Sequence, residues 1–126
     1  MPRRILVVDD DRSVLSMVSD LLEIEGYDVV QATHGFAALQ AVEEYLPDCV
    51  ILDVMMPGLD GHEVLRQIRG NPDRSRLPVV MLTAASEDEH TWQAWTEGVD
   101  YFLTKPFDPP ELLRFLDYLF QTPLAS

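Results

Sequence analysis

The sequence predicts an α/β fold, a doubly wound sheet of five parallel strands with helices on both faces. Four short runs of the chain are almost entirely apolar and do not alternate with polar residues, which is typical of strands covered on both faces. The segments between these runs carry apolar residues at helical spacing. Because strands and helices alternate along the chain, we expect helical crossovers between parallel strands, in a (βα)₅ order.

The strands are expected in these apolar runs and in one weaker run. The four apolar runs span residues 5–8, 49–52, 79–82 and 101–103, and we expect each of them to be buried on both faces. A fifth run, residues 27–31, contains polar residues and is therefore predicted to be an edge strand. Cys49 begins one of the buried runs and is expected to pack in the core.

Helices are predicted in the gaps between the strands. They are expected at residues 14–22, 36–45, 60–69 and 86–97, with a last helix that begins at Pro109 and Pro110. Asp11 and Asp60 precede the first and third helices and are interpreted as N-caps. Gly26 is interpreted as the C-terminal cap of the first helix. Each cap is therefore expected to satisfy backbone groups at a helix end.

The tryptophans and histidines show no pattern of a separate binding site. Trp92 and Trp95 lie three positions apart in the predicted fourth helix and are interpreted as core and boundary residues, with an aromatic docking patch as the alternative. The three histidines have no ligand spacing and are expected on the surface: His34, His62 and His90.

The composition restricts the class of partner and the compartment. With 22 Asp or Glu residues against nine Lys or Arg residues, the formal net charge is −13, which argues against direct binding to nucleic acid. The apolar runs are too short to span a bilayer, and the N-terminus lacks the pattern of a signal peptide. The single cysteine fits a reducing compartment. We therefore expect a cytoplasmic protein that does not associate with membranes.

The chain is expected to be one domain, residues 1–126, with a core at about residues 4–120. No Ser/Gly-rich linker interrupts the alternation of strands and helices. Because the alternating pattern occupies nearly all of the sequence, no output domain is expected within it.

Polar residues follow four of the predicted strands at the point where each strand ends. They are Asp9 and Asp10, Asp53, Thr83 and Lys105. Sites in open parallel sheets form at the carboxyl ends of the strands, so we expect these side chains to converge on one edge. Three carboxylates that lie close together repel one another unless a cation lies among them. Mg²⁺ prefers such oxygen ligands, and Mn²⁺ accepts them too.

This set of side chains is suited to chemistry on a phosphoryl group. An aspartate beside a bound divalent metal can act as a nucleophile, because the metal neutralises charge on both partners. An ammonium and a hydroxyl group can then stabilise the transferring oxygens. Lys105 is the only lysine of the chain, and Pro106 after it is a candidate for a cis peptide bond.

Four segments carry the ordered motifs of a known family. They are Ile-Leu-Val-Val-Asp-Asp at residues 5–10, Val-Ile-Leu-Asp-Val-Met-Met-Pro-Gly-Leu-Asp-Gly at 50–61, Val-Val-Met-Leu-Thr-Ala at 79–84 and Lys-Pro-Phe at 105–107. In this order and at these separations, the segments resemble the response-regulator receiver domains of two-component signal transduction, the CheY-like family. The resemblance extends from Ile5 to Leu119. It implies a flavodoxin-like fold with strand order 2-1-3-4-5 and a phosphorelay function.

The resemblance implies a role for each site residue. Asp53 is expected to accept a phosphoryl group from a histidine kinase, a phosphotransfer protein or a small phosphodonor. Asp9 and Asp10 are expected to hold Mg²⁺, directly or through water. Thr83 and Lys105 are each expected to bind a phosphoryl oxygen.

The resemblance also implies a switch and an output face. The backbone carbonyl of Met55 is expected to join the metal ligands, and Met55 and Ala85 are expected to tune the lifetime of the phosphate. Phe102 stands where the family has its switch aromatic, often a tyrosine, and its ring is expected to turn inward as Thr83 moves towards the phosphate. The face made by the fourth helix, fifth strand and fifth helix is expected to bind a downstream protein or a second copy of the chain.

Two other functions are open from the sequence alone. An aspartyl-phosphate phosphatase or mutase would use a similar sheet, but such enzymes typically carry a second acid two residues after the nucleophile, where this chain has Met55. A receiver that serves only as a scaffold, independently of phosphorylation, would not need the polar set at the strand ends. We therefore expect a switch that is not an enzyme beyond its own phosphorylation and slow dephosphorylation.

Overall fold

A parallel sheet of five strands forms the centre of the protein. The computed structural model describes residues 2–84 and 98–121. The strands are β1 (Arg4–Val8), β2 (Asp28–Ala32), β3 (Cys49–Asp53), β4 (Val79–Ala84) and β5 (Tyr101–Lys105). All neighbouring pairs are parallel, and the sheet order is β2-β1-β3-β4-β5. The predicted fold class and strand order are confirmed.

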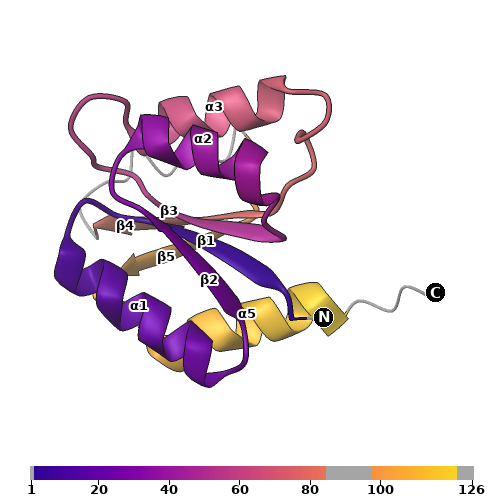
Figure 1. Cartoon of the computed structure of the whole chain (residues 1–126). Coiled ribbons are helices and arrows are strands. Elements are labelled where there is room, and N and C mark those ends of the chain that lie inside the picture. Colours follow the sequence, from indigo (N-terminus) through magenta and orange to yellow (C-terminus); the bar gives the residue numbers. More distant parts are fainter. Residues whose placement is uncertain (1, 85–97, 122–126) are drawn as a thin grey trace.

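Helices cover both faces of this sheet. The described helices are α1 (Arg12–Ile24), α2 (Gly35–Tyr45), α3 (Gly61–Gly70) and α5 (Pro109–Gln121). Figure 1 shows α2 and α3 on one face and α1 and α5 on the other. The predicted fourth helix at residues 86–97, with Trp92, Trp95 and His90, lies outside the described residues. None of the helices in the described ranges is both long and apolar enough to cross a membrane.

The strand residues divide the core into two layers. In β1, Leu6 and Val8 pack with the cluster that includes α2 and α3, whereas Ile5 and Val7 pack with the cluster that includes α1 and α5. Successive side chains of a strand point to opposite faces. Both faces are covered, so every position must be apolar, and this explains the unbroken apolar runs in the sequence.

β2 and β5 are the two edge strands of the sheet, and the sequence predicted this position only for β2. β2 lies at one edge, as its polar residues indicated. The prediction that the run at residues 101–103 is buried on both faces is wrong. β5 forms the other edge, and only Leu103 of this strand is buried. An edge strand has a neighbour on one side only, and an apolar run does not reveal this position.

The predicted helix caps are confirmed, and one histidine is not where it was expected. The side chain of Asp11 accepts hydrogen bonds from the backbone of α1, and that of Asp60 accepts one from the backbone of α3. Gly26 follows α1 with φ +93°, the left-handed conformation that suits glycine. His34 is exposed and caps α2. His62 was predicted on the surface but is 2% exposed, because it lies on the face of α3 that packs against the sheet.

Candidate functional site

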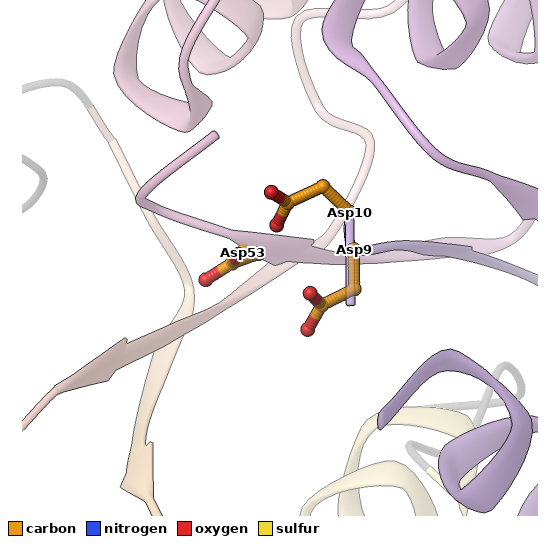
Figure 2. A group of neighbouring side chains, drawn as sticks. All are labelled: Asp9, Asp10 and Asp53. Carbon is orange, nitrogen blue, oxygen red and sulfur yellow. The ribbon is translucent and has the colours of Figure 1, made fainter. Parts of the chain in front are cut away.

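Three aspartates meet at the carboxyl ends of β1 and β3. Asp53 is the last residue of β3, and Asp9 and Asp10 directly follow β1, its parallel neighbour. One carboxylate oxygen from each of the three lies within 4.8 Å of the other two. Figure 2 shows the three side chains grouped around this strand edge. Asp9 and Asp53 are buried and Asp10 is exposed, so the cluster is reached from solvent on one side.

Lys105 contacts two of these aspartates. Its ammonium Nζ lies 3.0 Å from Oδ2 of Asp9 and 3.2 Å from Oδ1 of Asp53. Lys105 ends β5, which lies two strands away from β3 in the sheet. The Lys105–Pro106 peptide bond is cis, as the sequence suggested. The long lysine side chain therefore reaches over the end of β4 to the carboxylates.

The aspartates carry more negative charge than the ammonium balances. Burial raises the pKa of Asp53 to about 6, and the charge of Asp9 adds to this rise while Lys105 opposes it. Burial acts to lower the pKa of Lys105, but the hydrogen bond to Asp9 and the charge of Asp53 outweigh it and raise the pKa. The ionised form of Asp53 is thus disfavoured where it stands, and an added cation would favour it.

The remaining predicted site residues lie on β4, on β5 and in the loop after β3. Thr83 is 4% exposed, near the end of β4, and pairs in register with Thr104 of β5. Asp53 is paired with Leu82, so Thr83 lies one position beyond Asp53 on the neighbouring strand. Phe102 is partly buried on the α2 and α3 side of the sheet. Met55 lies in the loop after β3, with its residue surface 55% exposed.

Local hydrogen bonds fix the position of Asp9. Its Oδ1 accepts a hydrogen bond from the backbone N–H of Asp11 at 2.9 Å. Asp11 in turn caps α1 through hydrogen bonds from the backbone N–H groups of Ser13 and Val14. Of the three consecutive aspartates at residues 9–11, Asp11 therefore caps α1 and Asp9 belongs to the carboxylate cluster. The structure confirms the interpretation of Asp11 as a cap.

The chemistry of this cluster fits a hard divalent cation. Carboxylate oxygens are the ligands that Mg²⁺ and Mn²⁺ prefer, and three of them converge here. Burial raises the pKa of Asp53, and the negative charges of Asp9 and Asp10 raise it further. The residues present are therefore suited to hold such an ion.

The sequence matches the family model of the response regulator receiver domain over residues 5–117. The chain belongs to the response regulator receiver family. It is thus a receiver domain, the part of a response regulator that acts as a phosphoacceptor switch in two-component signalling.

Individual relatives agree with this family. The receiver is 42% identical over 112 residues to the alkaline phosphatase synthesis transcriptional regulatory protein PhoP of Bacillus subtilis, which is 89% of this chain and 46% of PhoP. It is 41% identical over 113 residues to the DNA-binding dual master transcriptional regulator RpaA of Synechocystis, 90% of this chain and 46% of RpaA. The receiver spans about half the length of these relatives.

A solved structure extends the similarity to three dimensions. A putative response regulator from Chloroflexus aurantiacus matches the receiver with a TM-score of 0.89 and 36% sequence identity. The match covers 94% of this chain and 97% of that one.

One residue that shapes the site was not singled out from the sequence. A Cβ at Gly61 would contact the backbone carbonyl of Asp53 and lie 2.8 Å from Cα of Val54. The N–H of Gly61 also donates to the carbonyl of Val54 at 3.0 Å. The first turn of α3 therefore rests directly on the backbone of the proposed phosphoacceptor. The signal in the sequence was the second glycine of Gly-Leu-Asp-Gly, at the end of the motif that begins at Val50.

Proposed function

We propose that Asp53 is the phosphoacceptor of this receiver. The main support for the proposal is that Asp53 belongs to a cluster of three carboxylates and also contacts an ammonium group. Asp9, Asp10 and Asp53 each place one carboxylate oxygen within 4.8 Å of the others, and Lys105 Nζ lies 3.2 Å from Asp53 Oδ1. A nucleophile between a cation site and a fixed positive charge is suited to attack on an anionic phosphoryl group.

The transfer is a substitution at phosphorus. One carboxylate oxygen of Asp53 forms a bond to the phosphorus of a phosphohistidine or a small acyl phosphate. The bond from phosphorus to the donor's nitrogen or oxygen breaks, and its electron pair leaves with the donor. Lys105 pairs with one phosphoryl oxygen, and the hydroxyl of Thr83 donates a hydrogen bond to another. The upstream partner is accordingly a histidine kinase or a phosphotransfer protein.

The metal ligands of this proposal are the three aspartates and the backbone carbonyl of Met55. When bound there, Mg²⁺ or Mn²⁺ neutralises negative charge on Asp53 and on the phosphoryl group. The raised pKa of Asp53 supports this assignment. The only reactions that the receiver promotes are its own phosphorylation and the slow hydrolysis of the phosphate.

The phosphoryl group changes the balance of charge at the strand ends. It adds negative charge beside Thr83 and Lys105, draws both side chains towards it and favours an inward Phe102. The output face then includes β5 and α5. There the ring of Tyr101 stacks on that of Phe115 at 4.6 Å, beside a groove of about 520 Å³. A downstream protein or a second copy of the receiver binds this face.

The negative charge of the receiver favours signalling through contact with another protein over direct contact with nucleic acid. PhoP and RpaA are named as transcriptional regulators, and RpaA as DNA-binding. With a net charge of −13, the receiver is unsuited to contact nucleic acid itself. Its signal is passed through contact between proteins.

The test is phosphorylation in vitro, read by intact mass. The purified protein is incubated with Mg²⁺ and acetyl phosphate, with and without EDTA. The wild type should gain one phosphoryl group that depends on Mg²⁺, and Asp53→Asn should gain none. Asp11→Asn is the matched control, because it is a nearby exposed aspartate and asparagine also caps helices well. Equal phosphorylation of Asp53→Asn would contradict the proposal.

A further inference from the structure

Arg69, in the last turn of α3, joins two segments that precede β4 and β5. Its Nε donates to the carbonyl oxygen of Gly98 at 2.9 Å. Its Nη1 donates to the carbonyl oxygen of Leu77 at 2.7 Å, and its Nη2 to Oδ2 of Asp100 at 2.9 Å. A planar guanidinium can make these contacts at the same time, whereas an ammonium group cannot. One side chain thus contacts α3, the entry to β4 and the entry to β5.

The carboxylate of Asp100 completes this connection. Its Oδ2 also accepts a hydrogen bond from the backbone N–H of Val79 at 2.8 Å, and the N–H of Asp100 donates to the carbonyl of Val79 at 3.0 Å. Val79 is the first residue of β4. The Arg69–Asp100 pair therefore fixes the start of β4 against the residue that directly precedes β5.

Gly98, whose carbonyl oxygen accepts the hydrogen bond from Arg69, has an unusual backbone conformation. Gly98 has φ +89°, a conformation that L-residues with side chains rarely adopt. A Cβ at this position would lie 3.2 Å from Nε of Arg69. The conformation therefore favours glycine, and a side chain at this position would crowd the guanidinium of Arg69.

These contacts lie at the ends of β4 and β5 opposite to the phosphoacceptor edge. β4 carries Thr83 near its carboxyl end, and β5 carries Phe102 and Lys105. The proposed signal starts at Thr83 and is read at Phe102. For Phe102 to respond, β5 must stay in fixed register beside β4 while side chains move at the other end.

We propose that Arg69 is a positioning residue of the switch. It holds the amino ends of β4 and β5 in fixed register on α3, so that a displacement at Thr83 is transmitted to Phe102 and is not absorbed by movement of β5. This inference rests on the proposed function of Asp53. Arg69 touches neither the phosphoryl group nor the metal ligands, and it acts only through the strands that carry the switch residues.

The test uses NMR of the full chain with Mg²⁺ and beryllofluoride, which imitates a phosphoryl group on an aspartate. The amide shifts of Thr83 and Phe102 are followed in the wild type, in Arg69→Ala and in Arg69→Lys. In the wild type both amides should shift. In both variants the shift of Thr83 should be retained and that of Phe102 should fall to less than half of the wild-type value. Alanine removes the three guanidinium contacts, and the ammonium group of lysine cannot make all three at once.

Arg66→Ala is the matched control. Arg66 lies one turn earlier on α3 and pairs with Glu63 of the same helix, so its loss should leave the Phe102 response unchanged. Asp100→Asn is a milder variant that keeps an oxygen for Val79 but weakens the pair with Arg69, and it should reduce the Phe102 response in the same direction.

The outcomes separate the inference from the proposed function. A wild-type Phe102 shift in Arg69→Lys and Asp100→Asn, with only a lower melting temperature, would overturn the positioning role and leave the role of Asp53 intact. No shift at Thr83 in the wild type would overturn both. A reduced Phe102 shift with a retained Thr83 shift would support the inference.

Discussion

The ammonium of Lys105 lies 3.2 Å from Oδ1 of Asp53. The chain has no other lysine, and this one also contacts Asp9 at 3.0 Å. Before any phosphoryl group arrives, Lys105 thus partly neutralises the same carboxylates that are proposed to hold a metal ion. The ammonium and the metal therefore compete for the charge of the cluster, and this competition has measurable consequences.

Removing the charge of Lys105 should tighten metal binding and slow phosphorylation. In Lys105→Met the three carboxylates lose their positive neighbour, so Mg²⁺ should bind about 10-fold more tightly, which corresponds to about 1.4 kcal/mol. Acetyl phosphate should react more slowly, because a phosphoryl oxygen loses its partner. Titration calorimetry and intact mass measure the two effects. Lys105→Arg keeps the charge and is the control; unchanged or weaker Mg²⁺ binding by Lys105→Met would contradict the competition.

The stability of the metal-free receiver should depend on the protonation of Asp53. The pKa of Asp53 in the folded state, about 6, lies above its ordinary value of 3.8. The folded state therefore binds a proton more readily than the unfolded state, and the contribution of Asp53 to the free energy of unfolding grows as the pH falls from about 7 to about 4. Asp53→Asn does not titrate, so its stability relative to the wild type should be highest above about pH 7 and should decline at lower pH.

Added Mg²⁺ should show the opposite pH dependence. The ion binds the ionised carboxylate, so its stabilising effect competes with protonation and should be largest above about pH 7. Thermal unfolding with and without Mg²⁺ at several pH values measures the effect. A rise in melting temperature that is the same at about pH 5 and about pH 7.5 would show that Asp53 is not among the ligands.

Gly61→Ala should disturb the site through the backbone. The new methyl group would press on the carbonyl of Asp53 and on Cα of Val54, and overpacking of this kind costs about 1–3 kcal/mol. Urea unfolding should show that loss, and phosphorylation by acetyl phosphate should slow. Gly70→Ala is the control, because nothing lies within 4 Å of a Cβ there. Equal stability of the two variants would rule out the contact between Gly61 and Asp53.

The sequence predicted the convergence of the site residues because sheet topology alone brings them together. Parallel strands place their carboxyl ends at one edge, so Asp9, Asp53 and Lys105 could be assigned to one site from their positions after apolar runs. The same reasoning assigned Thr83 to that edge. The contact of Lys105 with two carboxylates follows from the reach of its side chain across β4.

Features that depend on packing between distant segments were not predicted. An apolar run gives no sign of whether its strand has one neighbour or two, so the exposure of β5 was missed. His62 lies three residues before Leu65 on the buried face of α3, and this spacing was a usable signal that its polarity obscured. The contacts of Arg69 join α3 to residues 77, 98 and 100, and no local pattern in the sequence links these positions.

Chemical mapping of the phosphorylated residue directly tests whether Asp53 is the phosphoacceptor. The receiver is phosphorylated with acetyl phosphate and Mg²⁺ and then reduced with borohydride, which converts an aspartyl phosphate to homoserine and releases phosphate. Peptide mass spectrometry then locates the homoserine. Homoserine is expected at position 53, and only when Mg²⁺ is present during phosphorylation. Homoserine at position 9 or 10 instead, or at no position after a proven gain of phosphate, would contradict the assignment of Asp53.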